Sequence, residues 1–546
     1  MNTWNKVAMP SLLAMSVGLA LSGCDNNATV DSNTQTTTSL QAKVQTVVVI
    51  YAENHAFDKL FSNFPGANGL SATATYAPQT DRDANNTVLA TLPQTWGGVT
   101  AAGQTPVVTQ AQSAGLPNAP FQVETAFQAQ AGAPLSSSTI TRDLYHRFFE
   151  NQMQIDGGKN DKFAAWADSG GFVMGHFDYS QSSLFKLAQQ YVLADNFFQG
   201  AFGGSFLNHQ YLVCACAPEY PNADTAAAKP TIAVLNKDAN GNYLPQLTTA
   251  ANSPASAMDG KPVFALSGNI APKNYFNDGT FRAVNTMQPP YQPSGNAPAA
   301  SDTTGAYADP SSGTTLPAQT QQTIGDQLTA ANINWAWYSG AWNAALSSRA
   351  NIYNGTPGVN GATTPNFQPH HQPFNYFSRF DPVAHATDRA AHLKDYTNLV
   401  ADAAAGKLPP VVFYKPEGDL NQHPGYASIA AGDQHIAALI SQLQASPQWN
   451  NMMIVITYDE NGGAWDHVAP PKGDLVGPGT RIPAIVISPF AKKGTVDHTQ
   501  YDTASILRLI SRRFGLAPLP GVAARDAALK ANGGQPMGDL TNALAL

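Results

Sequence analysis

Charged residues are scarce in this sequence. Asp, Glu, Lys and Arg make up 12% of its 546 residues, against about 25% in a typical soluble protein. Positive charge is not in excess either, because the formal net charge is -8 and no block of basic residues occurs. We therefore do not expect a nucleic acid as a partner, since its phosphate backbone is bound largely by Lys and Arg. An anionic substrate would have to be held by local cations, a metal ion or helix N-termini.

Long apolar runs are almost absent as well. The exception covers residues 11–21, follows Lys6, and is too short to span a bilayer as a helix. The run leads into the letters LSGC, which end at Cys24 and resemble a bacterial lipoprotein signal, in which the Cys is lipidated after cleavage. An ordinary secretory signal with an incidental Cys is the alternative. We expect residues 1–24 to direct export, with a periplasmic, secreted or membrane-anchored protein as the result and the lipid on Cys24 as the anchor.

Cysteine is the third scarcity. Besides Cys24, the chain contains only Cys214 and Cys216. A bridge across one intervening residue would be strained, so we expect buried or free thiols here rather than a disulfide. Two thiols without further Cys or His at ligand spacing give little support for a zinc site.

Composition divides the rest of the chain into unlike regions. Residues 25–43 begin rich in Asn, Ser and Thr, which predicts a flexible tether. We expect residues 44–546 to form one domain, because large α/β enzymes often have this length as a single body with insertions. Two segments with weak periodicity, near 70–134 and 223–316, are predicted to be long surface insertions that cap one side of the domain.

Short apolar runs alternate with amphipathic stretches along the domain. The apolar, β-branched runs are typical of strands buried on both faces of a parallel sheet. They cover residues 44–51, 411–414, 452–458 and 482–488. Helical patterns cover residues 182–191, 323–331, 432–443 and 503–514. Strands that alternate with helices predict an α/β fold with a central, mostly parallel sheet flanked by helices.

Acidic residues follow two of the predicted strands. Glu53 and Asn54 come directly after the first strand, and Asp459 and Glu460 follow the strand at 452–458. Ligands of open α/β sheets bind at the carboxyl ends of the strands, so both pairs are expected at one edge. Carboxylates packed together repel one another unless a cation neutralises them, and their oxygens suit Mg²⁺, Ca²⁺ or Mn²⁺ and also accept Zn²⁺. The pattern predicts one divalent metal of unknown identity. For a single acidic pair, an ordinary surface loop would be the simpler reading.

Ser205 follows a pair of glycines in the segment 203–209 (GGSFLNH). Glycines let the backbone approach a ligand closely, so the hydroxyl of Ser205 is a candidate nucleophile, although a tight turn explains the glycines equally well. The segment lacks the nucleophile-elbow pattern of α/β-hydrolases, which argues against a serine esterase with a His base.

Several histidines lie in segments that could reach the same site. His370 and His371 are adjacent in a loop bounded by prolines, and His146, His423 and His467 lie in other candidate segments. A lone His is more often structural than functional. A protonated imidazole can neutralise phosphate, and it can donate a proton to a leaving oxygen.

The segments that carry these residues together resemble the bacterial phosphoesterase family, which contains acid phosphatases and phospholipases C and belongs to the alkaline phosphatase superfamily. The resemblance covers about residues 44–516, with the insertions least covered. Its motifs are VIYAENHAFD at 49–58, PGANG at 65–69, TYDENGG at 457–463, DHVAPP at 466–471 and RIP at 481–483.

The resemblance implies an alkaline phosphatase-like fold with long loop insertions over the active site. It also assigns roles to individual residues. Ser205 would be the nucleophile and form a phosphoserine intermediate. Asn54 would also face the phosphate. One metal ion would be held by Glu53, Asn54, Asp459 and Glu460. The phosphate pocket would be lined by His146, His371, His423 and His370, with one of them acting as acid to the leaving group.

Related members of the superfamily use two or three metal ions, whereas the acidic pairs here suffice for one. The histidines are the candidates to offset the remaining charge, and they would have to be protonated to do so. This expectation favours activity below neutral pH.

The resemblance favours an acid phosphatase that hydrolyses phosphomonoesters of small phosphorylated substrates. The segments LYHRF at 144–148, DGGK at 156–159 and HHQPF at 370–374 resemble the acid phosphatase branch, and phospholipase C members tend to carry Thr at the position of Ser205. The alternative is a phospholipase C that cleaves head-group phosphodiesters. A non-catalytic surface protein with structural calcium is a third possibility. A sulfatase is disfavoured because the sequence has no Cys-x-Pro-x-Arg segment.

Overall fold

A computed structural model describes residues 32–71, 73–355 and 364–546 of the chain. The export signal predicted over 1–24 lies outside the described residues. Within them, nine strands form one central sheet in the order β10-β9-β11-β1-β12-β13-β4-β14, with β15 also paired to β4. These strands are β1 (Thr46–Ala52), β4 (Val192–Phe198), β9 (Trp335–Ser339), β10 (Leu393–Asp395), β11 (Val411–Lys415), β12 (Met452–Tyr458), β13 (Arg481–Ile487), β14 (Thr495–Asp497) and β15 (Tyr501–Asp502).

The sheet is mostly parallel, as the sequence predicts. Strands β11, β1 and β12 pair in parallel and are buried along their whole length, in agreement with their continuous apolar sequences. Strand β13 differs from the expectation of a further parallel strand, because it runs antiparallel to both β12 and β4. The chain between β12 and β13 contains no helix in the described structure, and a parallel connection needs a crossover of that kind.

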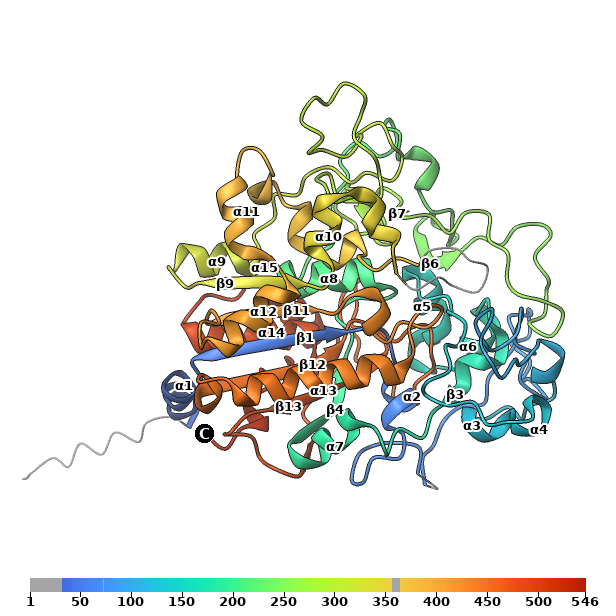
Figure 1. The fold of residues 1–546 in the computed structure, drawn as a ribbon. Coiled ribbons are helices and arrows are strands. Elements are labelled where there is room, and N and C mark those ends of the chain that lie inside the picture. Colours follow the sequence, from blue (N-terminus) through green and yellow to red (C-terminus); the bar gives the residue numbers. More distant parts are fainter. Residues whose placement is uncertain (1–31, 72, 356–363) are drawn as a thin grey trace, which may run out of the picture.

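Helices cover the sheet and confirm the α/β class. The four predicted helices are present as α7 (Ser183–Gln190), α9 (Ile324–Ala330), α13 (Ile429–Ala445) and α14 (Thr503–Phe514). Helix α13 lies in front of the sheet in Figure 1 and packs against α7 and α12 (Tyr396–Ala404). Helix α8 (Ser205–Cys214) contacts α14 and α9.

The segments at 70–134 and 223–316 contain few and short regular elements, such as α3 (Val123–Ala126), α4 (Gln128–Ala131) and the hairpin of β5 (Leu235–Lys237) with β6 (Tyr243–Leu247). In Figure 1 they lie on the side toward which the arrow of β1 points, together with α5 (Phe148–Ile155) and α6 (Phe163–Trp166). The carboxyl ends of the parallel strands therefore face these segments.

The part of the predicted tether that the structure describes is not extended. Residues 32–43 form helix α1 (Ser32–Lys43), and Leu40 of this helix is fully buried. The guanidinium of Arg512, on α14, donates a hydrogen bond to the carbonyl of Asn33, and Lys43 donates one to the carbonyl of Ala545. Helix α1 thus packs against the domain beside the C-terminus (Figure 1).

The expectation for Cys214 and Cys216 was wrong, because the two residues form a disulfide. Ala215 between them ends helix α8 in the left-handed conformation, with φ 50° and ψ 39°. This turn brings the two Cα atoms to 5.1 Å, which lies within the usual range for a disulfide. The sequence argument did not anticipate a helix end at this position.

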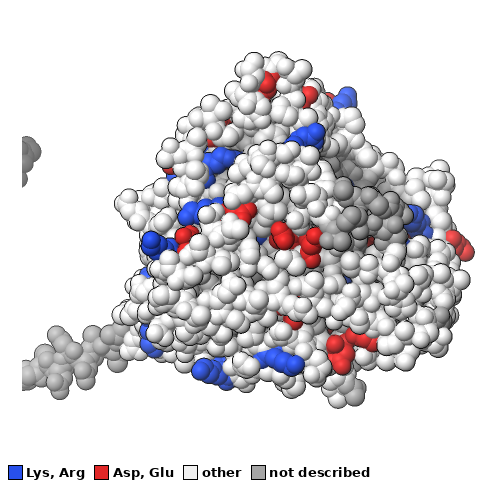
Figure 2. Space-filling model, viewed as in Figure 1, with Lys and Arg blue, Asp and Glu red and all other residues white. Residues whose placement is uncertain are grey.

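The surface reflects the low content of charged residues. On the face shown in Figure 2, Lys, Arg, Asp and Glu are scattered singly or in small groups over a mostly uncharged surface. Among the described residues, no helix has both the length and the apolar character needed to cross a membrane.

Candidate active site

The two acidic pairs lie side by side at the edge of the sheet. Strands β1 and β12 pair in parallel, with Ala52 opposite Tyr458, so the residues that follow each strand become neighbours. Glu53, Asn54, Asp459 and Glu460 are all fully buried. Carboxylate oxygens of Glu53, Asp459 and Glu460 lie within 4.8 Å of one another. The sequence argument from strand ends therefore located this cluster correctly.

Ser205 approaches the cluster from a third strand. The chain leaves β4, turns at Gly203 with φ +81°, and begins helix α8 at Ser205, with Gly204 as the N-cap residue. A Cβ atom on Gly203 would lie 2.3 Å from the backbone nitrogen of Phe148, so this turn requires glycine. The hydroxyl of Ser205 donates hydrogen bonds to Glu53 Oε2 at 3.1 Å and to Glu460 Oε1 at 3.4 Å. The N-terminal end of α8, where partial positive charge gathers, also faces the site.

The pKa values of the three carboxylates are shifted in different directions. Burial and the charge of Glu53 raise the pKa of Asp459 well above its usual value. Burial likewise raises the pKa of Glu460, and Glu53 adds to the effect. The pKa of Glu53 is shifted in the opposite direction: burial raises it, but the charge of Lys415, together with the close contact of His371, outweighs burial and holds it well below its usual value.

The residues present suit a divalent metal ion. Asn54 donates a hydrogen bond to Glu460 Oε1 at 3.1 Å, whereas its own Oδ1 is buried and has no hydrogen-bond donor. Glu53 Oε1 and Asp459 Oδ2 are also buried oxygens without a hydrogen bond. Buried polar atoms are normally satisfied, and three oxygen donors of this type are the ligands that hard cations prefer.

Sequence reasoning missed two residues of the site. Lys415, the last residue of β11, is buried beside the cluster, and its Nζ lies 2.7 Å from Glu53 Oε1. His209 lies one turn after Ser205 on α8, and its Nδ1 is 3.7 Å from Asp459 Oδ2. Burial and the charge of Lys415 lower the pKa of His209 well below its usual value. Lys415 follows a buried strand directly, so the rule that identified Glu53 and Asp459 applies to it as well.

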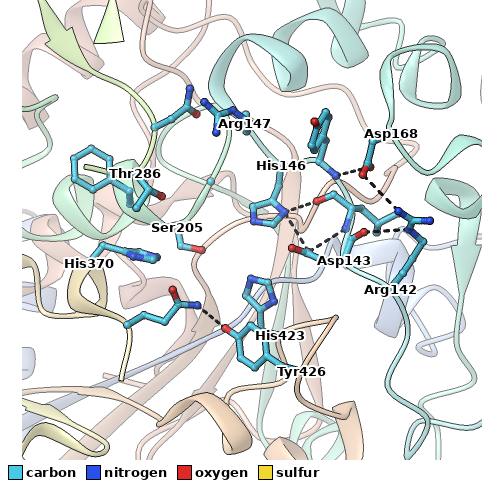
Figure 3. A pocket seen from close by; sticks show the side chains of 16 residues that line it. Arg142, Asp143, His146, Arg147, Asp168, Ser205, Thr286, His370, His423 and Tyr426 are labelled. Atoms are coloured by element: carbon cyan, nitrogen blue, oxygen red, sulfur yellow. Dashed lines mark hydrogen bonds and ion pairs between the residues drawn. The ribbon is translucent and has the colours of Figure 1, made fainter. Parts of the chain in front are cut away.

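Three of the predicted histidines line a cavity that opens next to Ser205. The cavity has a volume of about 600 Å³, and its wall includes His146, His370 and His423. Figure 3 shows the hydroxyl of Ser205 pointing toward the space between His146 and His423. Arg142, Asp143, Arg147, Asp168 and Tyr426 complete much of the wall.

His146 has a defined orientation and a raised pKa. Its Nδ1 lies 2.5 Å from the carbonyl oxygen of Leu144 and 3.5 Å from Asp143 Oδ1, while its Nε2 lies 3.9 Å from Glu460 Oε1. Burial lowers the pKa of His146, but the charges of Glu460 and Asp143 outweigh this effect and raise it to about 9. The ring is therefore protonated at neutral pH.

His370 and His371 do not fit the expectation of protonated residues that face phosphate. The Nε2 of His371 lies 2.7 Å from Glu53 Oε1, so this ring contacts a predicted metal ligand. Burial lowers the pKa of His371 to about 4 and that of His370 well below its usual value. Both are neutral at pH 7, because burial of an imidazole disfavours its charged form.

His467 takes no part in this site. Its Nδ1 lies 2.7 Å from Asp58 Oδ2, and Arg481 donates hydrogen bonds to both Asp58 and Asp466. Arg481 is fully buried. These contacts tie the loop after β1 to the start of β13, and they explain the motifs at 466–471 and 481–483 as structural.

Comparison with known proteins gives one match that covers most of the chain. A family model described as the phosphoesterase family matches residues 44–517.

Matches to individual curated proteins are shorter. Non-specific phospholipase C6 of Arabidopsis thaliana is 33% identical over 147 residues, which are 21% of this chain and 28% of that protein. Phospholipase C B of Mycobacterium tuberculosis is 32% identical over 155 residues, 24% of this chain and 30% of that protein. Non-hemolytic phospholipase C of Pseudomonas aeruginosa is 30% identical over 150 residues, 22% of each chain. The matched segments span less than a third of the length of these relatives.

Solved structures show more distant likeness. A protein in the alkaline phosphatase superfamily from Vibrio parahaemolyticus has 9% identity and a TM-score of 0.29, with 65% of both chains covered. A lipoteichoic acid synthase from Listeria monocytogenes has 8% identity and a TM-score of 0.28, with 73% of this chain and 74% of that chain covered.

Proposed function

The chain belongs to the phosphoesterase family, and from this premise we propose that it hydrolyses phosphate esters with Ser205 as the nucleophile. The observation that carries the proposal is the position of the Ser205 hydroxyl. It starts helix α8, contacts two carboxylates of the acidic cluster and points into the cavity between His146 and His423. A nucleophile, an anion-compatible helix end and a protonated acid thus meet at one point.

Glu53, Asn54, Asp459 and Glu460 would hold one divalent metal ion. When bound, such an ion lowers the pKa of a nearby hydroxyl and polarises a phosphoryl oxygen. The buried oxygens of Asn54 and Asp459 without hydrogen-bond donors support this assignment.

The reaction would then proceed in two displacements at phosphorus, each assisted by residues of the chain. Ser205 Oγ attacks phosphorus, and its proton passes to Glu53 or Glu460, which already accept its hydrogen bonds. The ester bond on the side of phosphorus opposite Ser205 Oγ breaks, and His146 Nε2 donates a proton to the leaving oxygen. Water then attacks phosphorus of the phosphoserine and gives a proton to neutral His146. The bond between phosphorus and Ser205 Oγ breaks, and the carboxylate that took the Ser205 proton returns it to Oγ. Two in-line steps give net retention at phosphorus.

The nature of the ester distinguishes two candidate functions. The motif details of the sequence favour a phosphomonoester, but the curated relatives named above are phospholipases C. Their names favour the alternative, cleavage of the phosphodiester of a lipid head group, and we place it first. The observation that keeps an acid phosphatase as the second candidate is Ser rather than Thr at position 205, together with the acid phosphatase-like segments around His146 and His371.

Two substrates separate these candidates. The full chain is assayed with 4-nitrophenyl phosphate, a soluble monoester, and with phosphatidylcholine vesicles. A phospholipase C releases phosphocholine and diacylglycerol from the vesicles, with kcat/KM at least about tenfold above that for the monoester, whereas an acid phosphatase gives the reverse order. A non-catalytic protein with structural calcium would gain thermal stability with Ca²⁺ and release product from neither substrate.

Replacement of Ser205 tests the nucleophile. We expect Ser205→Ala to lower kcat by more than about a thousandfold, because the covalent intermediate cannot form. Wild-type protein quenched during turnover should show a phosphate on the peptide that contains Ser205 by mass spectrometry. Ser441→Ala, an exposed position on α13, serves as the control and should retain full activity. Near-normal kcat in Ser205→Ala would rule out the covalent mechanism.

Membrane association through a lipidated Cys24 stays a prediction of the sequence. Mass spectrometry of the protein purified from its native membrane would detect the diacylglyceryl group, and Cys24→Ser should release the protein from the membrane fraction.

A further inference from the structure

Lys415 is a buried cation beneath the acidic cluster. It is the last residue of β11, the neighbour of β1, and only 1% of its side chain is exposed. Its Nζ lies 2.7 Å from Glu53 Oε1 and 3.9 Å from Asp459 Oδ2. The same Nζ lies 5.5 Å from the ring centroid of Tyr51. Burial of an ammonium group is costly unless a compensating charge lies nearby, so this position calls for a specific explanation.

The contacts of Lys415 indicate that its side chain acts through its positive charge and not through hydrogen bonds. Within the part of the chain that the structure describes, Nζ makes no hydrogen bond of acceptable geometry, although it nearly touches Glu53. No other Lys or Arg of the described residues lies within 4 Å of the three carboxylates.

A charge count shows what this ammonium does. Glu53, Asp459 and Glu460 carry three negative charges when ionised, whereas Asn54 is neutral. One divalent ion offsets two of these charges, and one remains in a site that is closed to water. His146 faces Glu460 from the cavity at 3.9 Å, whereas Lys415 supplies a positive charge beside Glu53 and Asp459. It also stands close to the position that a second divalent ion would need in order to share Glu53 and Asp459.

We propose that Lys415 is a positioning residue whose fixed charge completes a one-metal site, so that Glu53 and Asp459 bind a single divalent ion and a second ion is repelled. The inference rests on the proposed metal-assisted function and deepens it. It assigns to Lys415 a positive charge beside Glu53 and Asp459 that the sequence had left to the histidines.

Metal binding to Lys415→Gln tests the inference. The full chain is stripped of metal and titrated with Mg²⁺, Ca²⁺, Mn²⁺ and Zn²⁺ separately by isothermal titration calorimetry. Loss of a neighbouring positive charge removes repulsion of the ion, and in a site of low dielectric this effect is large. We expect Lys415→Gln either to bind one ion at least about tenfold more tightly than wild type or to bind a second ion. If Lys415 merely held Glu53 in place, the affinity would fall or stay unchanged at one ion per chain, and either result would overturn the inference.

The matched control is Lys394→Gln. Lys394 lies on β10 of the same sheet, where its Nζ is 3.5 Å from Asp402 Oδ2, and its side chain is 30% exposed. This variant loses the same charge from an ion pair far from the acidic cluster in the strand order. Its metal affinity and stoichiometry should equal those of wild type.

A double variant tests the charge count without metal or activity. In metal-free protein, Lys415→Gln removes the cation nearest to Glu53 and Asp459 and should lower the melting temperature. Adding Asp459→Asn removes one negative charge and should recover at least half of this loss. A double variant that is no more stable than Lys415→Gln contradicts the charge count. If Lys415→Gln does not fold, then recovery of folded protein in the double variant supports the inference and failure to recover it rejects it.

Failure of this inference and failure of the proposed function have different signatures. If wild type binds no divalent ion, or Ser205→Ala retains its activity, the proposed function fails. If wild type binds one ion and requires Ser205, while Lys415→Gln binds that ion no more tightly, only the role of Lys415 fails.

Discussion

His146 is the residue best suited to protonate the leaving group. It lines the cavity beside Ser205, and its Nδ1 is oriented by the carbonyl of Leu144, which leaves Nε2 toward the reacting centre. We expect His146→Gln to lower kcat by about a hundredfold for an alkyl phosphate ester, whose leaving oxygen needs a proton. For 4-nitrophenyl phosphate, whose leaving group is stable as an anion, the loss should be below about tenfold. Steady-state kinetics with both esters measures the difference, and equal losses would exclude His146 as the acid.

The pKa of His146 also sets a pH dependence. Because the charges of Glu460 and Asp143 raise this pKa to about 9, the protonated acid is present at lower pH and is lost as the pH rises through 9. We expect kcat/KM for an alkyl ester to fall on the alkaline side as His146 loses this proton. Asp143→Asn removes one of the two charges and should move the midpoint of this fall to lower pH. A profile that is identical in both proteins would show that another group controls the alkaline limb.

The residues that sequence reasoning found and missed differ in physical terms. Glu53 and Asp459 were found because carboxylates directly after buried strands are unusual and because parallel strands end at one edge. Lys415 also lies at the carboxyl end of a buried strand, but it is a single cation after a short predicted strand. The sequence offers no second residue of the same kind at another strand end that would have drawn attention to it. His370 and His371 lie beside Ser205 and Glu53, as expected from the sequence. The expectation that they are protonated does not fit, because burial in the folded chain lowers their pKa values. No pattern in the sequence reveals that burial.

The turn between β4 and α8 determines where Ser205 lies. Gly203 has φ +81°, and its backbone passes so close to Phe148 that a Cβ atom would lie 2.3 Å from the Phe148 nitrogen. Phe148 follows the segment that carries His146. Gly203→Ala should therefore separate Ser205 from His146, lower kcat at least about tenfold and destabilise the protein by about 2 kcal/mol. Activity assays and chemical denaturation measure the two effects.

Gly241→Ala is the control for this prediction. Gly241 has a similar φ of +84°, but nothing lies within 4 Å of the added Cβ atom. The backbone strain alone should then cost about 1 kcal/mol of stability and leave kcat unchanged. If both variants have the same kcat, the close approach at Gly203 does not position Ser205.

The secondary structure shows how far local patterns predict a fold. Strands β1, β11 and β12 were predicted to within two residues, because buried parallel strands are continuous apolar runs. The direction of β13 was not predictable from its own residues, since it depends on the connection before it. The disulfide at the end of α8 was missed for a similar reason: the left-handed turn at Ala215 is a property of a helix end, and the helix over 205–214 was not predicted from its weakly amphipathic sequence.

The molecule has few charged residues on its surface, whereas its buried site contains several. The sheet brings Glu53, Asp459 and Glu460 to one edge, and the insertions at 70–134 and 223–316 lie on the same side (Figure 1). The three carboxylates are fully buried, and burial strengthens electrostatic interactions among them. The stability of the folded chain should therefore depend on the metal ion and on pH together.

The sign of this dependence follows from the pKa shifts in the metal-free protein. Burial raises the pKa values of Asp459 and Glu460 in the folded state, so folding retains protons that the unfolded chain releases at about pH 4. Their contribution to stability is fully present below that pH and is lost as the pH rises through the raised values. Asp466, whose pKa is raised to about 6, acts in the same direction. The lowered pKa of Glu53 acts in the opposite sense, but its contribution is lost only as the pH falls below its usual range.

Between about pH 5 and pH 8, the contribution of Asp459 and Glu460 to the melting temperature of metal-free protein should therefore fall as the pH rises. The buried imidazoles of His209, His370 and His371, whose pKa values are lowered, act in the opposite direction below about pH 6.5. A bound divalent ion favours the ionised carboxylates of Asp459 and Glu460, so the fall should be much smaller in metal-loaded protein, and the stabilisation by metal should be larger at pH 8 than at pH 5. Differential scanning calorimetry with and without chelator, at several pH values, measures both trends. Asp466 contributes equally with and without metal, so the difference between the two series isolates the acidic cluster. If the two melting curves ran parallel across this range, the carboxylates at the ends of β1 and β12 would not be the metal ligands.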